Sequence, residues 1–252
     1  MEYIKKNGKP LDIRAHVGKT LKGFTVVQGS CTDGQNVYLI FERKKSKSAS
    51  HRCKIVKMDI DSLKVVKVSQ SLKLGHGNDM CHRDGILYVT HSEGSMVVHR
   101  VDAGSLKQKK GVKVTLPKKL KGKKIAAFNG IAPYGSGFIL RVMGGSGMLI
   151  VNRNFRGTRF FRTKTSYTTS QGMDHKGGKI YRTYSKLQSK DKNFLVTYDK
   201  KGLQISRERI PVVGELEGVF LVSGKPWFVV YRKKNVEGEK KYCAFIGTVH
   251  PA

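Results

Sequence analysis

The sequence predicts an all-β protein, and more specifically a five-bladed β-propeller of four-stranded antiparallel blades. The first observation is a short pattern that occurs five times: a polar residue, then a turn signal, then an apolar strand. The polar residues stand at positions 28, 78, 129, 171 and 217, so the period is about 42 to 51 residues, which suits one blade. The second observation is that no stretch shows a persuasive 3.6-residue apolar period, which disfavours helices.

The second unit, GHGNDMCHRDGILYVTH, shows the pattern most clearly. A polar cluster around Asn78 is followed by Asp84-Gly85 and then by the apolar run ILYVT. Asp-Gly between two apolar runs is a strong hairpin signal, because glycine adopts positive φ without steric strain. The other four units carry a turn signal at the corresponding place: Asp33-Gly34, Ser136-Gly137, Gly177-Gly178 and Ser223-Gly224.

The remaining strands predict how the ring closes. Runs such as FILRVM, MLIV and WFVVY are apolar on both faces, as expected when each blade lies between two neighbours. The fifth unit ends one strand short, so we expect the segment before Gln28 to supply the missing outer strand. Residues 1–252 read as a single propeller domain. A β-sandwich is the competing architecture, but it would not require five matching units.

The charge of the chain is its most unusual bulk property. It has 49 basic and 18 acidic residues, a net charge of +31 and a pI near 10.1. Such a field attracts polyanions, so an anionic polymer or glycan is the expected partner. Nucleic acid, a teichoic-acid-like polymer, an acidic polysaccharide and an anionic membrane surface all remain open, as does a merely well-solvated surface. No recognition helix, RNP motif or zinc finger is present, so only non-specific nucleic-acid binding is compatible with the sequence.

Three basic clusters, at 43–52, 107–124 and 153–164, are the parts of the chain that would carry this attraction. The first is predicted to be an exposed loop. The third interleaves three phenylalanines with arginines, a pattern that can stack on bases or sugars. Its favoured interpretation is an outer strand whose phenylalanines face the next blade.

Cysteine and histidine spacing predicts neither a metal site nor a cofactor. The four cysteines show no C-x-x-C or histidine-paired spacing, and each lies in or beside an apolar strand; they are Cys31, Cys53, Cys81 and Cys243. Four histidines, at 82, 91, 99 and 175, read as ordinary half-exposed side chains. No hydrophobic signal core follows Met1 and no long apolar stretch exists. We therefore expect no transmembrane segment, a monomer, and either a cytosolic protein or a mature exported form.

The polar markers of the five units predict a ligand site at one mouth of the propeller channel. In register they are amides and acids, and four of the five are followed by glycine, which permits close backbone approach. The predicted ligand-binding residues are Gln28, His76, Asn78, Asp79, Asn129, Gln171, Asp174, Glu215 and Glu217. The competing interpretation is that these side chains satisfy the turn that begins each inner strand.

Catalysis is the alternative to binding. Asp79, Asp174 and Glu217 come from different blades, and His76 stands near the first of them; a pair of carboxylates is what glycoside hydrolysis requires. Five-bladed glycosidases use acids from separate blades in this way, but here the first and third units offer only amides. No nucleophile signature is present. We favour a binding module over a hydrolase or lyase acting on a glycan or phosphoester, with a protein-interaction scaffold as the third hypothesis.

Four blade segments carry a resemblance to known proteins. TSQGMDHKGGKIYRTYS and ELEGVFLVSGKPWFVVYRKK resemble blades of helveticin J-type bacteriocins. VVQGSCTDGQNVYL and LGHGNDMCHRDGILYVTH are similar to a broader group of propeller proteins of Gram-positive bacteria, often secreted or surface-bound. The resemblance implies a five-bladed propeller, a role at the cell envelope and a location outside the cytoplasm. It implies no catalytic residues.

Overall fold

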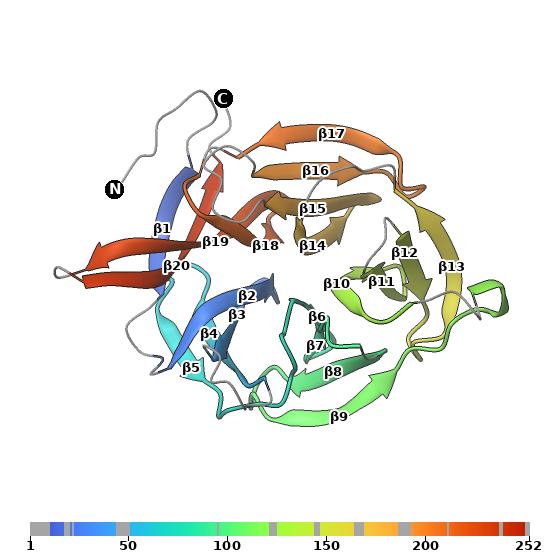
Figure 1. Cartoon of the computed structure of the whole chain (residues 1–252), viewed down its shortest axis with the longest axis horizontal. Coiled ribbons are helices and arrows are strands. Elements are labelled where there is room, and N and C mark those ends of the chain that lie inside the picture. The colour runs from blue at the N-terminus through green and yellow to red at the C-terminus, as the bar shows by residue number, and fades with distance from the viewer. Residues whose placement is uncertain are drawn as a thin grey trace.

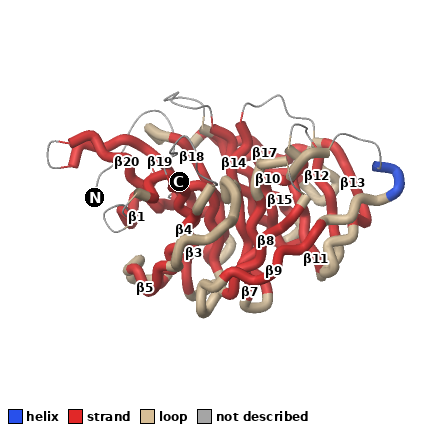
Figure 2. Tube along the Cα trace, turned by 60° about the horizontal axis from the view of Figure 1, so that its bottom comes forward, coloured by secondary structure: helices blue, strands red, loops and turns tan. Residues whose placement is uncertain are grey.

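Five antiparallel sheets of four strands each stand around a common axis, as predicted (Figure 1). The computed structural model describes residues 11–17, 21, 23–43, 51–94, 96–120, 125–143, 147–163, 169–185, 193–210, 212–236 and 239–249. Strands make up most of this part of the chain, and its one short helix, η1 (Lys118–Leu120), lies at the outer edge (Figure 2). The protein is therefore all-β, and each sheet is one blade.

The blades follow one another along the chain. Blade 1 contains β2 (Phe24–Thr32), β3 (Asn36–Arg43), β4 (Cys53–Asp59) and β5 (Val65–Val68). Blade 2 contains β6 (Asp79–Arg83), β7 (Ile86–Thr90), β8 (Val97–Asp102) and β9 (Gln108–Lys113). Blade 3 contains β10 (Phe128–Tyr134), β11 (Gly137–Val142), β12 (Gly147–Val151) and β13 (Gly157–Arg162). Blade 4 contains β14 (Thr169–Lys176), β15 (Lys179–Ser185), β16 (Phe194–Tyr198) and β17 (Gln204–Arg209).

Blade 5 combines the two ends of the chain. It contains β18 (Glu215–Val222), β19 (Lys225–Val236) and β20 (Glu239–Val249), and its outer strand is β1 (Leu11–Val17). β1 pairs antiparallel with β20, giving the order β1-β20-β19-β18. The prediction that the N-terminal segment closes the ring is confirmed, and this closure holds the two ends of the chain together in one sheet.

The hairpin turns fall close to the predicted positions. Asp84 and Gly85 both have positive φ, 50° and 73°, which is the type I′ geometry expected of Asp-Gly. In the third unit the turn was predicted at Ser136-Gly137, but it lies slightly earlier in the chain. The residue with positive φ is Gly135, and Gly137 already begins β11.

The hydrophobic core consists of layers between neighbouring blades. Five clusters of buried side chains fill these layers, each drawing on two adjacent sheets. Phe155, from the third basic cluster, is 2% exposed and packs against Tyr88 of blade 2 at a ring centroid distance of 5.6 Å. Phe161 is buried in the next layer. These two phenylalanines therefore face other blades, as the favoured interpretation predicted, and are not free to stack on a ligand.

The inner strands β2, β6, β10, β14 and β18 meet at the axis, and small residues let them do so. A Cβ on Gly29 would lie 2.7 Å from the Cα of Asp79, and one on Gly172 would lie 2.6 Å from the Cα of Gly218. These separations are shorter than any Cβ contact allows. The glycines that follow the polar markers therefore serve strand packing at the axis.

Asp79 replaces glycine in the second unit, and its carboxylate fills the centre. The side chain is fully buried, and Oδ2 accepts the backbone N–H groups of Ile131 (3.0 Å) and Met173 (3.1 Å). One carboxylate of blade 2 thus joins blades 3 and 4. Burial raises the pKa of Asp79 well above its usual value, although the N–H donors act in the opposite direction.

The stability of the ring should depend on this carboxylate and on pH. Asp79→Ala leaves two buried N–H groups unpaired and should lower the free energy of unfolding by about 2–5 kcal/mol. Asp79→Asn keeps an oxygen that can accept these N–H groups, so it should lower the free energy of unfolding by less than Asp79→Ala does. Because the folded pKa of Asp79 is raised, its stabilising contribution is present below the unfolded pKa near 4 and is lost as pH rises through the folded pKa. In urea titrations from pH 4 to 8, the free energy of unfolding of Asp79→Asn should therefore increase relative to that of the wild type as pH rises.

The exposed variant Asp61→Asn controls for the change in net charge. A difference between wild type and Asp79→Asn that stays constant over this pH range would contradict the assignment.

Candidate functional site

The propeller has two mouths, and the predicted site residues are divided between them. The chain enters each inner strand at one end of the ring, the entry face, and leaves it through a hairpin turn at the other end, the turn face. His76, Asn78, Gln171, Glu215 and Glu217 precede or begin inner strands and so lie toward the entry face. Because successive strands are antiparallel, the connections β3–β4 and β7–β8 reach the same face.

Asp174 lies toward the turn face instead. It lines a pocket of about 430 Å³ together with the turn residues Gly34 and Ser223. Its Oδ2 accepts the N–H of Leu221 at 2.9 Å, and burial raises the pKa of Asp174 to about 6. The acids that the sequence analysis grouped as catalytic candidates thus occupy three levels: Glu217 toward the entry face, Asp79 at the axis and Asp174 toward the turn face.

A pair of carboxyl groups stands at the entry end of β18. Glu215 and Glu217 hydrogen-bond to one another, and Glu215 Oε1 also accepts Gln171 Nε2 at 2.7 Å. Glu217 is 3% exposed, and burial followed by the charge of Glu215 raises its pKa well above the usual value. Burial raises the pKa of Glu215 as well. The two neighbouring carboxyl groups are therefore more stable sharing one proton than carrying two negative charges.

Beside this pair, two imidazoles converge on the carboxylate of Glu42. His76 Nδ1 lies 2.8 Å from Glu42 Oε2, and His51 Nδ1 contacts Glu42 Oε1. Burial alone would raise the pKa of Glu42, but the hydrogen bonds and charges of His76 and His51 hold it below the usual value. Sequence reasoning selected His76 and missed the other two. The available signal was an acid ending the otherwise apolar run VYLIFE.

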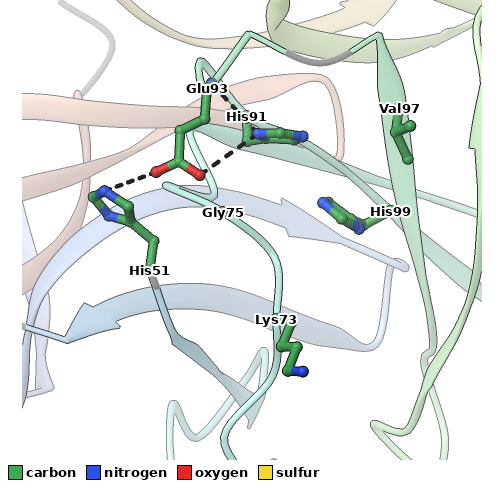
Figure 3. A pocket seen from close by; sticks show the side chains of 7 residues that line it. All are labelled: His51, Lys73, Gly75, His91, Glu93, Val97 and His99. Carbon is green, nitrogen blue, oxygen red and sulfur yellow. Dashed lines mark hydrogen bonds and ion pairs between the residues drawn. The ribbon is translucent and has the colours of Figure 1, made fainter. Parts of the chain in front are cut away.

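A pocket of about 460 Å³ opens next to this cluster (Figure 3). Glu93 stands between two histidines in it: its Oε1 lies 2.7 Å from His51 Nε2 and its Oε2 lies 4.0 Å from His91 Nδ1. His91 in turn packs on His99 at a ring centroid distance of 4.9 Å. Burial, followed by the charge of His91, lowers the pKa of His99 to about 4.

Two arginines that the sequence analysis did not select lie toward the entry ends of β11 and β15. Arg141 Nη1 donates to Asn129 Oδ1 at 2.6 Å. Arg182 is 1% exposed, and its guanidinium lies 4.9 Å and 5.6 Å from the ring centroids of Tyr184 and Tyr198. Within the described residues neither arginine has a carboxylate at ion-pair distance, and each has a buried Nε atom without a hydrogen-bond partner. Burial, then the charge of Arg182, lowers the pKa of Arg141 to about 10.

Other predicted residues lie close to the axis or in the core. Gln28 is buried at 6% exposure, and Asn78 has a buried Oδ1 without a partner in the structure. The thiols of Cys31, Cys53 and Cys81 are free and buried, and burial raises the pKa of all three. For Cys243 the structure describes only the backbone. None of the described helices could span a membrane.

Comparison with known proteins finds similarity in the fold but none in the sequence. Neither a protein-family model nor a curated protein matches the sequence of this chain. A glutaminyl cyclase of Myxococcus xanthus superposes with a TM-score of 0.59 at 11% identity, covering 96% of this chain and 97% of its own. A GH43_1 enzyme of Xanthomonas citri superposes with a TM-score of 0.60 at 10% identity, covering 94% of this chain and 91% of its own. CoXyl43, a GH43 β-xylosidase/α-arabinofuranosidase from a compost metagenome, gives 0.59 at 12% identity, covering 96% and 98%.

At these identities the comparisons show the fold alone. The class that they and the strand topology define is the five-bladed β-propeller. The chemistry of this chain has to be argued from its own side chains.

The buried arginine offers a direct test of the site's electrostatics. In the ligand-free protein, Arg182→Met removes a charge that no carboxylate within the described residues compensates. Replacing even a buried ion pair with apolar side chains of similar volume is often neutral or stabilising by about 1–4 kcal/mol, and a charge without a carboxylate has less attraction to lose. Urea unfolding should therefore give Arg182→Met a stability equal to or above that of the wild type. A loss of more than about 2 kcal/mol would show that the guanidinium is fully compensated.

Proposed function

We propose that this protein is a binding propeller that recognises an anionic, hydroxyl-rich polymer at its entry face. A glycan that bears phosphate or carboxylate groups has the required chemistry. The observation that carries the proposal is the pair of half-buried Arg141 and buried Arg182, two guanidinium groups with no carboxylate partner in the described part of the chain.

The physical argument is one of uncompensated charge. Removing a guanidinium from water is unfavourable unless an opposite charge and hydrogen bonds replace the lost solvation. The two guanidinium groups also repel one another, and burial followed by this repulsion lowers the pKa of Arg141 to about 10. An anion bound near both would offset the desolvation and the repulsion together, and arginine suits phosphate and carboxylate because its donors form a planar fork.

The other half of the entry face suits hydroxyl groups. Gln171 and Glu215 form a hydrogen-bonded rim, and Asn78 has an acceptor atom without a partner. Amide and carboxyl groups in a polar recess bind sugar or polyol hydroxyls through paired donor and acceptor contacts. The face therefore combines the cationic groups of β11 and β15 with hydroxyl-binding groups near the starts of β6, β14 and β18.

The net charge of the protein would bring such a polymer to the surface. Lys109, Lys110 and Lys113 lie exposed on β9, the outer strand of blade 2. Lysine ammonium groups attract polyanions without fixed geometry, so they raise the association rate more than the specificity. A polymer with repeated anionic groups would meet the outer lysines first and the arginine pair afterwards.

Two further points support a glycan. The solved structure of CoXyl43 is a complex with xylotriose, so a propeller of this shape can hold an oligosaccharide, although that is an analogy of fold. The blade segments that resemble helveticin J-type bacteriocins and Gram-positive surface propellers fit an envelope polymer. The proposal accordingly includes a single-domain monomer located outside the cytoplasm or at the cell surface.

Binding assays with a matched pair of variants test the proposal. Titration with glycerol-phosphate teichoic acid, heparin and DNA over a salt series should show binding that weakens as salt rises. Arg141→Gln should lose about 10–100-fold in affinity for the preferred polymer, since a charge-assisted hydrogen bond contributes about 1.5–3 kcal/mol. The control Arg156→Gln removes the same charge from an exposed position and should change affinity less than about twofold.

Equal losses in the two variants would mean that attraction is diffuse and that the entry face is not the site. Absence of polymer binding together with recovery of one protein partner would favour the scaffold hypothesis instead.

The carboxyl pair favours a second candidate function, hydrolysis of a glycan or phosphoester. A carboxyl group whose pKa is raised can act as a general acid, and burial raises the pKa of both Glu215 and Glu217 at the same face. In a screen of such substrates, turnover should be abolished by Glu217→Gln. Asp174→Asn, toward the turn face, should leave it intact. If turnover persisted in Glu217→Gln, the carboxyl pair would have no catalytic role.

A further inference from the structure

We propose that Glu42, His51 and His76 form a binding site for a divalent transition-metal ion, with Zn²⁺ the best match. This goes beyond polymer binding, and the sequence analysis predicted no metal. The three residues come from different segments: the end of β3, the loop before β4 and the loop before β6. Only the folded ring brings them together.

The donor atoms are close enough to enclose an ion. One donor atom from each residue, a carboxylate oxygen and two imidazole nitrogens, can be chosen so that all three lie within 4.8 Å of one another. In a tetrahedral zinc site with bonds of about 2.0–2.2 Å, ligand atoms lie about 3.3–3.6 Å apart, so small side-chain movements would complete the site. The rings of His51 and His76 are perpendicular, with centroids 5.8 Å apart, and both direct Nδ1 at the carboxylate.

The contacts of His51 are those of a metal-bound histidine. Both of its nitrogens face carboxylates: Nδ1 faces Glu42, and Nε2 lies 2.7 Å from Glu93 Oε1. A neutral imidazole carries one N–H, so it can donate to only one of the two. If Nδ1 binds a metal ion, the proton resides on Nε2 and is donated to Glu93. The contact between His51 and Glu93 (Figure 3) would then be the outer half of a carboxylate–histidine–metal arrangement, in which a second residue orients the metal ligand.

The loop that carries His76 is held in place by tight packing. Gly75 and Gly77, on either side, have φ of 61° and 62°, and a Cβ on Gly77 would lie 2.9 Å from Ile40 Cγ2. Cys53 Sγ also donates to the Gly75 carbonyl at 3.2 Å. Glu42 is 5% exposed at a strand end, so its carboxylate has little freedom. These ligands are preorganised, which favours binding.

The composition of the site selects the metal and leaves one position open. Two imidazoles and one carboxylate suit zinc, whereas magnesium and calcium prefer oxygen ligands only. Three protein ligands leave a fourth coordination position for water or for a ligand group. The carboxyl pair of β18 is close enough to this cluster for Glu217 to interact with Glu42 and for Glu215 to interact with His76, and Lys73 lines the adjacent pocket.

Metal titration of the untagged, chelator-treated full chain tests the proposal without any polymer. Calorimetry with zinc chloride should show one ion per chain, and Co²⁺ should give the visible absorption of a four- or five-coordinate nitrogen/oxygen site. His51→Asn and His76→Asn should weaken zinc binding by at least about 100-fold, and Glu93→Gln by about 10–100-fold. His82→Asn, which removes a histidine outside the cluster, should change it less than about twofold.

Two further variants separate metal ligation from folding and from the polymer site. His76→Cys should retain zinc binding, because a thiolate is also a zinc ligand, whereas it cannot reproduce the imidazole hydrogen bond to Glu42. Arg141→Gln should bind zinc normally even if it loses the polymer. No saturable zinc binding by the wild type, or binding that survives both His51→Asn and His76→Asn in variants with native thermal melts, would overturn the proposal.

Discussion

The carboxylate of Asp79 is the contact on which the centre of this propeller depends. The inner strands approach so closely at the axis that four units present glycine there, and the remaining space is filled by one acidic side chain. Its Oδ2 accepts two N–H groups from two other blades, so strands far apart in sequence are joined at one atom. A buried carboxyl group is unfavourable unless it is hydrogen-bonded, and here the hydrogen bonds are what hold the blades in register.

The position of Asp79 separates the other acids of the inner strands. Glu217 lies toward the entry face and Asp174 toward the turn face, with the buried Asp79 between them, so Glu217 and Asp174 do not form one carboxylate pair. The entry face has the richer set of groups: a carboxyl pair on β18, two histidines converging on Glu42, and two arginines in blades 3 and 4. An anionic polyol and a divalent cation would use different parts of that face, which is why the two proposals can be tested separately.

Four of the residues predicted to bind a ligand lie toward this face, and their role in binding stays a prediction. His76, Gln171, Glu215 and Glu217 were selected because of their positions in the repeat, and repeat register is a property of the sequence. Arg141 and Arg182 were missed because an arginine inside an apolar run looks like an ordinary outward-facing residue until the neighbouring blade covers it. Glu42 and His51 were missed because their partners come from other loops, and Asp174 was placed with Glu217 because spacing along a strand does not show which mouth a side chain reaches.

The sequence by itself determined the number of blades, the antiparallel four-strand plan and the closing role of the N-terminal strand. These follow from local signals, namely turn residues, apolar runs and a repeat length. Local signals do not depend on contacts with distant parts of the chain, so they can be read from the sequence. Only the tertiary structure decided which polar groups meet, which become buried and which remain without partners. Those outcomes depend on contacts between blades, where the spacing is set by packing and the electrostatics by distance through a low-dielectric interior.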